Sequence, residues 1–500
     1  MLGTAVPVSV LTDAYKASHW LQYPGAQKMV AYGEFRCGYN KDTADTRLAW
    51  YGIRYIVENY VQRQWTMEDV AQADAFYSTF MAPAYTCYPF PRELFEKFVT
   101  DNDGYFPVTI QALPEGSAVH AHVPVYQITS EGEYAPLCTF LETLLTMAWY
   151  PTTVATLSRR ARDAIGAVFD ASVEGGAGSA LLGSRLHDFG FRGCTTPEQS
   201  VVGGCAHLLN FTGTDTMSAA YYAQFHLNGG RPVANSIPAT EHSVMTAWPS
   251  EGAAIRNMID HFGSGLFACV MDSYDYAEAL SSVLPSIASR KVEAGGYMVL
   301  RPDSGDPVEV VLQGLRAADK VFGSDVNAKG FKEIRGAGVI QGDGIDIDVL
   351  KDILDAVLAE GYAASNVAFG MGGGLLQKVN RDTMSFATKL SHMVYADGTP
   401  RDVMKHPKTD STKYSLPGVL AVKRVGGVPT AFPADSGEVD PSEDMLQVVY
   451  DCGPVEGLEW DSFDAVRARL AAEWAALPCA ADVVSASLRA KMAAELGGAA

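Results

Sequence analysis

The sequence predicts an α/β fold, an irregular TIM-like α/β barrel with a second, smaller β-rich α+β domain. From about residue 150, short apolar runs alternate with helical stretches, a pattern typical of parallel strands joined by crossover helices. At least five consecutive runs end in polar or glycine clusters, which favours a barrel whose loops form one site. A doubly wound open sheet is the rival architecture, but it concentrates such clusters near one switch point. Because 500 residues exceed one ordinary core, two domains are expected.

The first 150 residues have the mixed pattern of an α/β region. We expect a short strand at 8–12, helices at 48–64 and 67–80, and strands between 105 and 129 with a turn at 114–116. His120 and His122 share one face of such a strand; with no third ligand nearby, a solvated strand face is favoured over a metal site.

A helix at 159–169 opens the barrel domain, which we place at 151–384. Its strands and the clusters after them are expected at 186–193, 209–215, 267–275, 298–305, 338–344 and 367–374, with a helix at 347–359. Beyond 385, alternating runs at 393–395, 419–425 and 446–450 indicate β-structure, and 463–496 indicates terminal helices. Region 1–150 is expected to pack with 385–500 as the smaller domain.

The glycine-rich stretch from Gly370 to Lys378 follows an apolar run and opens a possible helix. Glycines let backbone N–H groups approach an anion closely, and a helix start adds partial positive charge. The alternative is a flexible strand-to-helix connection, because the spacing matches neither a Walker loop nor a full dinucleotide fingerprint.

Composition limits the classes of partner. The formal net charge of −20 disfavours binding to nucleic acid or to an anionic membrane surface. Eight scattered cysteines without a Cys-x-x-Cys pair are typical of reduced thiols. No signal peptide and no apolar run of membrane-spanning length is evident. We therefore expect a cytoplasmic protein.

Several strand ends carry groups suited to phosphate, ribose and a flat ring. Arg301 and Asp303 combine a guanidinium that fits phosphate with a carboxylate for a hydroxyl or metal ion; the alternative is a surface ion pair. Phe189 and Arg192 could sandwich a heteroaromatic ring, unless Phe189 is core and Arg192 solvated. Asp215 could accept a ligand N–H or cap a helix.

His242 lies in a loop beside Glu241, and Asp272 follows a strand that the barrel would bring near it. A lone histidine is usually structural. Here a carboxylate that orients one ring nitrogen would leave the other available as nucleophile or acid/base.

These motifs, in order, resemble the nicotinamide phosphoribosyltransferases, which are type II phosphoribosyltransferases. The resemblance rests on Leu-His-Asp-Phe-Gly-Phe-Arg-Gly at 186–193, Phe-Thr-Gly-Thr-Asp-Thr at 211–216, Asp-Ser-Tyr-Asp at 272–275, Arg-Pro-Asp-Ser-Gly at 301–305, Ile-Gln-Gly-Asp-Gly at 340–344, and Gly-Gly-Gly-Leu-Leu-Gln-Lys at 372–378. Asp-Ala-Tyr-Lys at 13–16, together with Gln-Tyr-Pro at 22–24, resembles the N-terminal signature.

The resemblance implies conversion of nicotinamide and phosphoribosyl pyrophosphate into nicotinamide mononucleotide and pyrophosphate. It also implies magnesium, with ligands left unknown, ATP as co-substrate, and a homodimer with shared active sites.

The resemblance also implies roles for individual residues. Catalysis would involve His242, phosphorylated by ATP and oriented by Asp272, together with Arg301 and Asp303. Substrates would be bound by Asp13, Tyr15 from the partner subunit, Phe189, Arg192, Asp215, Ser236, Arg301, Asp303, Gly342, Asp343, Gly372, Gly373 and Arg381. ATP or phosphate would be bound by Lys389, Lys405 and Lys413.

Three positions depart from the pattern: Met371 and Ala14 stand where serine is expected, and Phe191 where tyrosine is expected. The alternatives are a nicotinate phosphoribosyltransferase of the same fold, a non-catalytic scaffold, and a barrel isomerase or aldolase. The last would need a catalytic Lys or Glu at a strand end, and none is convincing.

Overall fold

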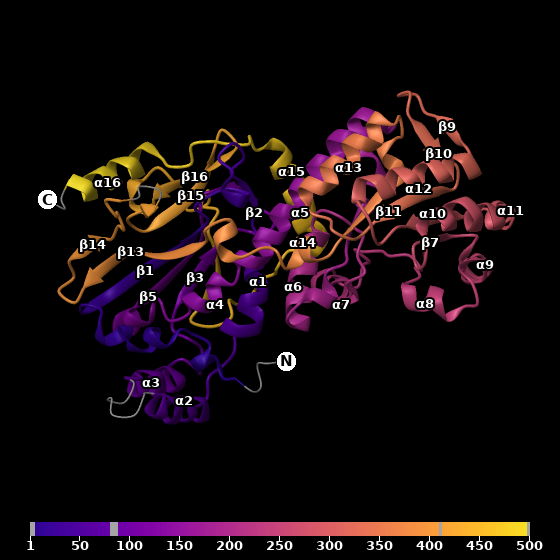
Figure 1. Cartoon of the computed structure of the whole chain (residues 1–500). Coiled ribbons are helices and arrows are strands. Elements are labelled where there is room, and N and C mark those ends of the chain that lie inside the picture. Colours follow the sequence, from indigo (N-terminus) through magenta and orange to yellow (C-terminus); the bar gives the residue numbers. More distant parts are fainter. Residues whose placement is uncertain (1–5, 81–88, 410–412, 498–500) are drawn as a thin grey trace. The chain divides into compact units, whose positions relative to one another are not determined.

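The computed structural model describes residues 6–80, 89–409 and 413–497. Contacts divide the chain into two compact units (Figure 1). Unit 1 comprises Met1–Thr156, Asn380–Asp461 and Ala465–Ala500, and unit 2 comprises Leu157–Val379 with Ser462–Asp464. The sequence predicts boundaries at 150/151 and 384/385, close to these limits. Unit 1 is the β-rich one and holds more of the chain than unit 2, so the expectation that it would be the smaller part is wrong.

Unit 2 is built on a five-stranded parallel sheet with the order β6-β12-β11-β8-β7. The strands are mostly buried apolar runs, as expected when helices connect parallel strands. Their bounds are β6 (Leu186–Asp188), β7 (Leu266–Val270), β8 (Tyr297–Arg301), β11 (Ala337–Gln341) and β12 (Val367–Met371).

Isolated parallel bridges continue this sheet beyond its named strands. Asp188 bridges Thr214, Gly213 bridges Asn235, and Ala239 bridges Ala268 on β7. The segment at 209–215, expected as a strand, forms only single bridges, at Gly213 and Thr214, and not a continuous strand. The sheet is therefore a curled parallel half-barrel extended by single bridges.

Crossover helices begin at side-chain caps. The Asp306 carboxylate accepts hydrogen bonds from the first turn of α12 (Pro307–Phe322), and Asp346 does the same for α13 (Ile347–Ala359). Both helices bury one apolar face. The other helices that lie within unit 2 are α6 (Pro197–Leu208), α7 (Met217–Tyr222), α8 (His242–Ala247), α9 (Glu251–Phe262), α10 (Tyr276–Glu278), α11 (Leu284–Ala294) and α14 (Gly373–Leu376). A two-stranded hairpin pairs β9 (Ser324–Val326) with β10 (Lys332–Ile334).

Unit 1 contains a six-stranded sheet with the order β14-β13-β1-β5-β3-β17, antiparallel at every pairing. Its strands are β1 (Ala26–Glu34), β3 (Thr109–Ala112), β5 (Pro124–Glu131), β13 (Ala387–Tyr395), β14 (Pro400–Asp402) and β17 (Gln447–Asp451). Strand β1 pairs with β5 on one side and with β13 on the other, so distant parts of the chain share one sheet.

Two smaller pairs and several helices complete unit 1. The pairs are β2 (Arg47–Ala49) with β4 (Ala118–His120) and β15 (Leu420–Val425) with β16 (Val428–Pro433). The helices are α1 (Ile53–Ile56), α2 (Met67–Thr79), α3 (Arg92–Asp101), α4 (Glu142–Thr146), α15 (Phe463–Ala476) and α16 (Ala486–Gly497). Helix α5 (Trp149–Ser172) contains the boundary between the units, and the first two residues of α15 belong to unit 2.

Some local expectations differ from the structure. Residues 8–12 contain a 3-10 turn, η2 (Val8–Val10), instead of a strand. The helix expected at 48–64 is replaced by β2, α1 and the π-helical turn η5 (Val57–Val61). His120, expected on a solvated face, is buried, and this burial lowers its pKa to about 4. None of the described helices is both long and apolar enough to cross a bilayer.

Candidate functional site

A cavity of about 810 Å³ lies in unit 2 at the ends of its parallel strands, within the size range of small-molecule sites. Loops after β6, β8, β11 and β12 all reach it, because parallel strands end at the same edge of a sheet. Its lining includes Phe189, Arg192, Asp215, Arg301, Asp303, Gly342, Asp343, Gly372 and Gly373. These expected residues come from motifs up to about 185 positions apart in the chain.

The ring of Phe189 packs closely against two glycines. A Cβ atom built on Gly370 would lie 2.0 Å from Cε2 of the ring, and one on Gly342 would lie 2.9 Å from the same atom. No side chain fits at those positions while the ring stays in place. The guanidinium carbon of Arg301 lies 5.7 Å from the ring centroid, within cation–π range. Glycines and a cation therefore hold one aromatic ring at the pocket.

Arg301, Asp303 and His242 form a connected polar chain. Arg301 donates to Oδ1 of Asp303 at 2.7 Å, and Oδ2 of Asp303 lies 3.2 Å from Nε2 of His242. Burial works to raise the pKa of Asp303, but Arg301 and His242 together bring that pKa below its ordinary value. Asp303 is consequently anionic at neutral pH and accepts from both neighbours.

Two carboxylates lie near the ring of His242. The carboxylate closest to the ring is that of Asp303, whereas Oδ1 of Asp272 lies 3.9 Å from Nε2. Asp272 instead accepts from the backbone N–H of Asp303 at 2.9 Å and from the Ser304 hydroxyl at 2.6 Å. Asp272 therefore holds the loop that carries Asp303. The other ring nitrogen, Nδ1, lies 3.2 Å from the hydroxyl of Ser273.

Asp215 is exposed at the pocket, and Ser236 donates to its Oδ1 at 2.5 Å. Buried Asp188 lies behind this loop: its carbonyl accepts from the Asp215 N–H at 3.0 Å, and its Oδ1 accepts from the Gly190 N–H at 2.7 Å. Burial, reinforced by the charge of Asp215, raises the pKa of Asp188 to about 6. Asp188 thus connects the loop of Phe189 to that of Asp215.

The glycine loop opens only a short helix, α14, of four residues. Gln377 ties this loop to the one after β6, because its side-chain N–H group donates to the Gly190 carbonyl at 3.0 Å. Met371, which stands where serine is expected, is fully buried. Phe191, another departure, is exposed on the pocket lining.

The remaining residues expected to bind substrate, ATP or phosphate belong to unit 1. Tyr15 is 54% exposed. Lys389 donates to the carbonyl of Thr388 at 2.8 Å, and burial lowers its pKa. Arg381 lies 3.6 Å from Asp382, and the backbone N–H of Lys405 donates to Ser415 at 2.8 Å. Asp13 and Lys413 are exposed.

Sequence reasoning missed part of the lining. Thr216, Gly344, Ile345, Gln377 and Lys378 also face the cavity. Each lies within or beside one of the motifs quoted above, and that position is the signal that could have identified it. The packing of the Phe189 ring against Gly370 could not be read from a local motif. The two residues lie about 180 positions apart in the chain, one in the loop after β6 and the other on β12.

Comparisons with known proteins identify the family. Residues 184–453 match the model of the nicotinate phosphoribosyltransferase (NAPRTase) family, and residues 7–110 match the nicotinamide phosphoribosyltransferase N-terminal domain. A nicotinamide phosphoribosyltransferase of Xanthomonas campestris is 40% identical over 469 residues, which cover 91% of this chain and 96% of the relative. One from Acinetobacter baylyi is 30% identical over 495 residues, covering 92% and 96%.

Solved structures show the same fold. The human nicotinic acid phosphoribosyltransferase superposes with a TM-score of 0.62 at 20% identity, over 97% of this chain and 100% of that one. A nicotinate-nucleotide pyrophosphorylase from Pyrococcus furiosus gives a TM-score of 0.59 at 14% identity, covering 93% and 95%. With its family model matched over more than half its length, the chain belongs to the nicotinate phosphoribosyltransferase family.

Proposed function

We propose that this enzyme is a pentosyltransferase of NAD biosynthesis that converts nicotinamide and phosphoribosyl pyrophosphate into nicotinamide mononucleotide and pyrophosphate. The names of relatives at 40% and 30% identity support this substrate. The structural observation that carries the proposal is the carboxylate of Asp215 at a pocket also lined by Arg301 and Phe189.

Nicotinamide would stack on Phe189 and donate its amide N–H to Asp215. Because Ser236 occupies Oδ1 of Asp215, the other carboxylate oxygen is the one directed to the ligand in this proposal. A carboxylate accepts hydrogen bonds only, so it suits an amide N–H and repels the carboxylate of nicotinate. Asp215 would therefore set the preference for the amide.

Breaking the bond between C1 and pyrophosphate develops positive charge on the ribose and negative charge on the leaving group. Fixed charges aimed at these positions lower the barrier. Arg192 and Arg301 line the pocket as cations for phosphate, and anionic Asp303 would stabilise the ribosyl cation. Gly342, Asp343, Gly372 and Gly373 would receive the ribose and its phosphate.

Magnesium is part of the proposal. The described residues contain no group of three or more His, Cys, Asp or Glu side chains able to hold a metal ion. Mg²⁺ commonly takes one or two protein carboxylates and completes its shell with phosphate oxygens and water. Asp343 fits that requirement, since it is exposed on the lining and its carboxylate has no hydrogen bond or ion pair among the described residues. When bound, the ion would neutralise charge on the departing pyrophosphate.

ATP would act through His242. Asp303 is anionic and can only accept, so Nε2 of a neutral His242 carries the ring proton. The lone pair is then on Nδ1, beside the Ser273 hydroxyl. Attack of Nδ1 on the γ-phosphorus would form an N–P bond and release ADP. Lys389, Lys405 and Lys413 would serve as cations for ATP or phosphate.

A homodimer with shared sites belongs to the same proposal. The segment after Asp215 exposes an apolar stripe of Met217, Tyr221 and Phe225, which are 79%, 62% and 53% exposed. Their spacing of four residues places them on one helical face, which a second copy would cover. Asp13, Tyr15 and Arg381 would then bind substrate across the dimer.

Two broader features complete the proposal. The parallel bridges from Asp188 through Gly213 and Asn235, and from Ala239 to β7, support an irregular TIM-like barrel.

A cytoplasmic location is supported by the free thiols among the described cysteines.

The test is to incubate the protein with phosphoribosyl pyrophosphate, magnesium and either nicotinamide or nicotinate, with and without ATP, and to detect the mononucleotide by mass. Turnover of the amide with little turnover of the acid supports the proposal. Preference for the acid would indicate a nicotinate phosphoribosyltransferase, and no turnover of either substrate would favour a non-catalytic scaffold.

A further inference from the structure

The N-terminal signature contains a charged residue, Lys16, to which the proposed function gives no role. Lys16 is only 7% exposed, and its ammonium group forms an ion pair with Glu142 at the start of α4. An ammonium group so far from water requires a partner, because an unpaired buried charge is strongly disfavoured. The pair therefore fixes the segment around Lys16 against residues 139–143 of the same unit.

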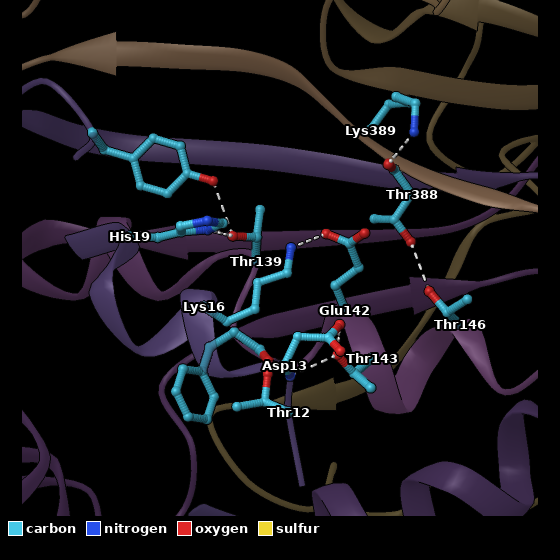
Figure 2. Close-up of polar contacts among 12 residues, drawn as sticks. Thr12, Asp13, Lys16, His19, Thr139, Glu142, Thr143, Thr146, Thr388 and Lys389 are labelled. Carbon is cyan, nitrogen blue, oxygen red and sulfur yellow. Dashed lines mark hydrogen bonds and ion pairs between the residues drawn. The ribbon is translucent and has the colours of Figure 1, made fainter. Parts of the chain in front are cut away.

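Further contacts join the same two segments (Figure 2). The Thr143 hydroxyl donates to Oδ2 of Asp13 at 2.9 Å, and the Asp13 N–H lies 3.3 Å from the Thr143 hydroxyl oxygen. Thr12 donates to the carbonyl of Phe140 at 2.9 Å. Two rings further along meet Thr139: Nδ1 of His19 at 3.5 Å and the hydroxyl of Tyr23 at 2.9 Å. We call residues 139–143 the anchor segment.

The spacing of the anchored positions has a geometric consequence. Residues 14–21 form the 3-10 helix η3 (Ala14–Leu21), in which side chains three positions apart lie one above the other. Asp13, Lys16 and His19 follow that spacing and all contact the anchor segment. Tyr15 is out of step with them and is 54% exposed. The contacts therefore hold one side of η3, and the Tyr15 ring, 5.2 Å from that of His19, rests against the anchored residues while about half of it stays exposed.

The charge of Glu142 also acts on the hydroxyl group of Tyr15. Burial raises the pKa of the Tyr15 hydroxyl, and the negative charges of Asp13 and Glu142 raise it further. At the other end of α4, the Thr146 hydroxyl lies 3.3 Å from that of Thr388, the residue before Lys389. One short helix thus contacts both the Tyr15 segment and the start of β13.

We propose that Glu142 and Thr143 are positioning residues, which fix Tyr15 and Asp13 in the orientation needed to close on nicotinamide. This inference rests on the proposed function, in which those two residues bind substrate in a second copy. It assigns to the anchor segment a part in substrate affinity in addition to its part in folding.

The test compares Glu142→Gln and Thr143→Val with the wild type in steady-state kinetics. Glu142→Gln keeps the shape and removes the charge that holds Lys16, and Thr143→Val removes the hydroxyl that donates to Asp13. We expect the KM for nicotinamide to rise about tenfold and about fivefold respectively, with kcat and the KM for phosphoribosyl pyrophosphate within about twofold of wild type. Thr143→Ser should restore the wild-type KM, since it restores the donor.

Glu131→Gln provides a matched control, because Glu131 pairs with Lys28 at the surface of the same unit and its side chain is 64% exposed. Its kinetics should equal those of the wild type.

A double-mutant cycle with Tyr15→Ala separates positioning from general damage to the fold. If Glu142 acts through Tyr15, Glu142→Gln has no further effect on the nicotinamide KM once the ring is gone. Additive effects, or equal rises in both KM values, would overturn the positioning role. If Glu142→Gln fails to fold, Thr143→Val in a cycle with Asp13→Ala decides the question, because the Thr143 hydroxyl donates to Asp13. A wild-type protein without turnover overturns the proposed function and this inference together, whereas an active wild type with unchanged variants overturns this inference alone.

Discussion

Replacing Asp215 by asparagine tests the basis of amide recognition. The change keeps the size of the side chain and its bond to Ser236, but it removes the negative charge from the pocket. Loss of a hydrogen bond to a charged group costs roughly 1.5–3 kcal/mol, equivalent to about 10- to 150-fold in kcat/KM. Because Asp215 is exposed in the free chain, solvent competes for its carboxylate. We therefore expect the lower end, about a tenfold loss with nicotinamide.

Nicotinate should respond in the opposite direction. The side-chain amide introduced by Asp215→Asn can turn an N–H toward the acid, so kcat/KM for nicotinate should hold or rise while that for nicotinamide falls. The assay is mononucleotide formation with each substrate, and Asp260→Asn is the control, because Asp260 forms an exposed ion pair with Arg290. Parallel losses with both substrates would refute the reasoning, since they would indicate damage to the pocket in place of a change in preference.

Three further predictions follow from the site. Gly370→Ala places a methyl group where the Phe189 ring lies, so the KM for nicotinamide should rise more than about tenfold. The control is Gly178→Ala, which has open space around its Cβ and should leave the KM unchanged. An unchanged KM in Gly370→Ala would contradict the role of Gly370 in positioning the ring. His242→Ala should abolish stimulation by ATP more than basal transfer, measured as rates with and without ATP; equal loss of both would count against a phosphohistidine. Asp188 has a pKa raised by burial from 3.8 to about 6, so its contribution to stability is present at low pH and is lost as pH rises through about 6, by roughly 3 kcal/mol in the limit. Asp188→Asn should remove that pH-dependent loss from the free energy of unfolding measured in denaturant, and identical pH profiles of variant and wild type would disprove it.

Much of the pocket was predictable because strand direction does most of the positioning. A residue just after a parallel strand lies at the same edge as residues after its neighbours. Phe189, Arg301, Gly342 and Gly372 each lie at the end of such a strand or directly after it, so local sequence sufficed to bring them together.

Contacts that depend on distant packing were not predictable. The burial of His120 follows from pairing of β4 with β2, and nothing in the sequence near it sets that environment. Likewise, residues 8–12 have strand-like composition, but Val8–Val10 form a 3-10 turn. The choice of Asp303 over Asp272 as the carboxylate nearest His242 depends on fractions of an ångström in three loops.

The pairing of β1 with β13 has a consequence for synthesis on the ribosome. Strand β1 ends at Glu34, and the strand that covers one of its edges begins only at Ala387. Until about 350 further residues have been translated, that edge has unpaired backbone groups, which is a recognised hazard for aggregation. Unit 2 is almost continuous in sequence and can fold in the meantime. A nascent chain stalled before residue 387 should therefore depend on chaperones far more than the finished protein does.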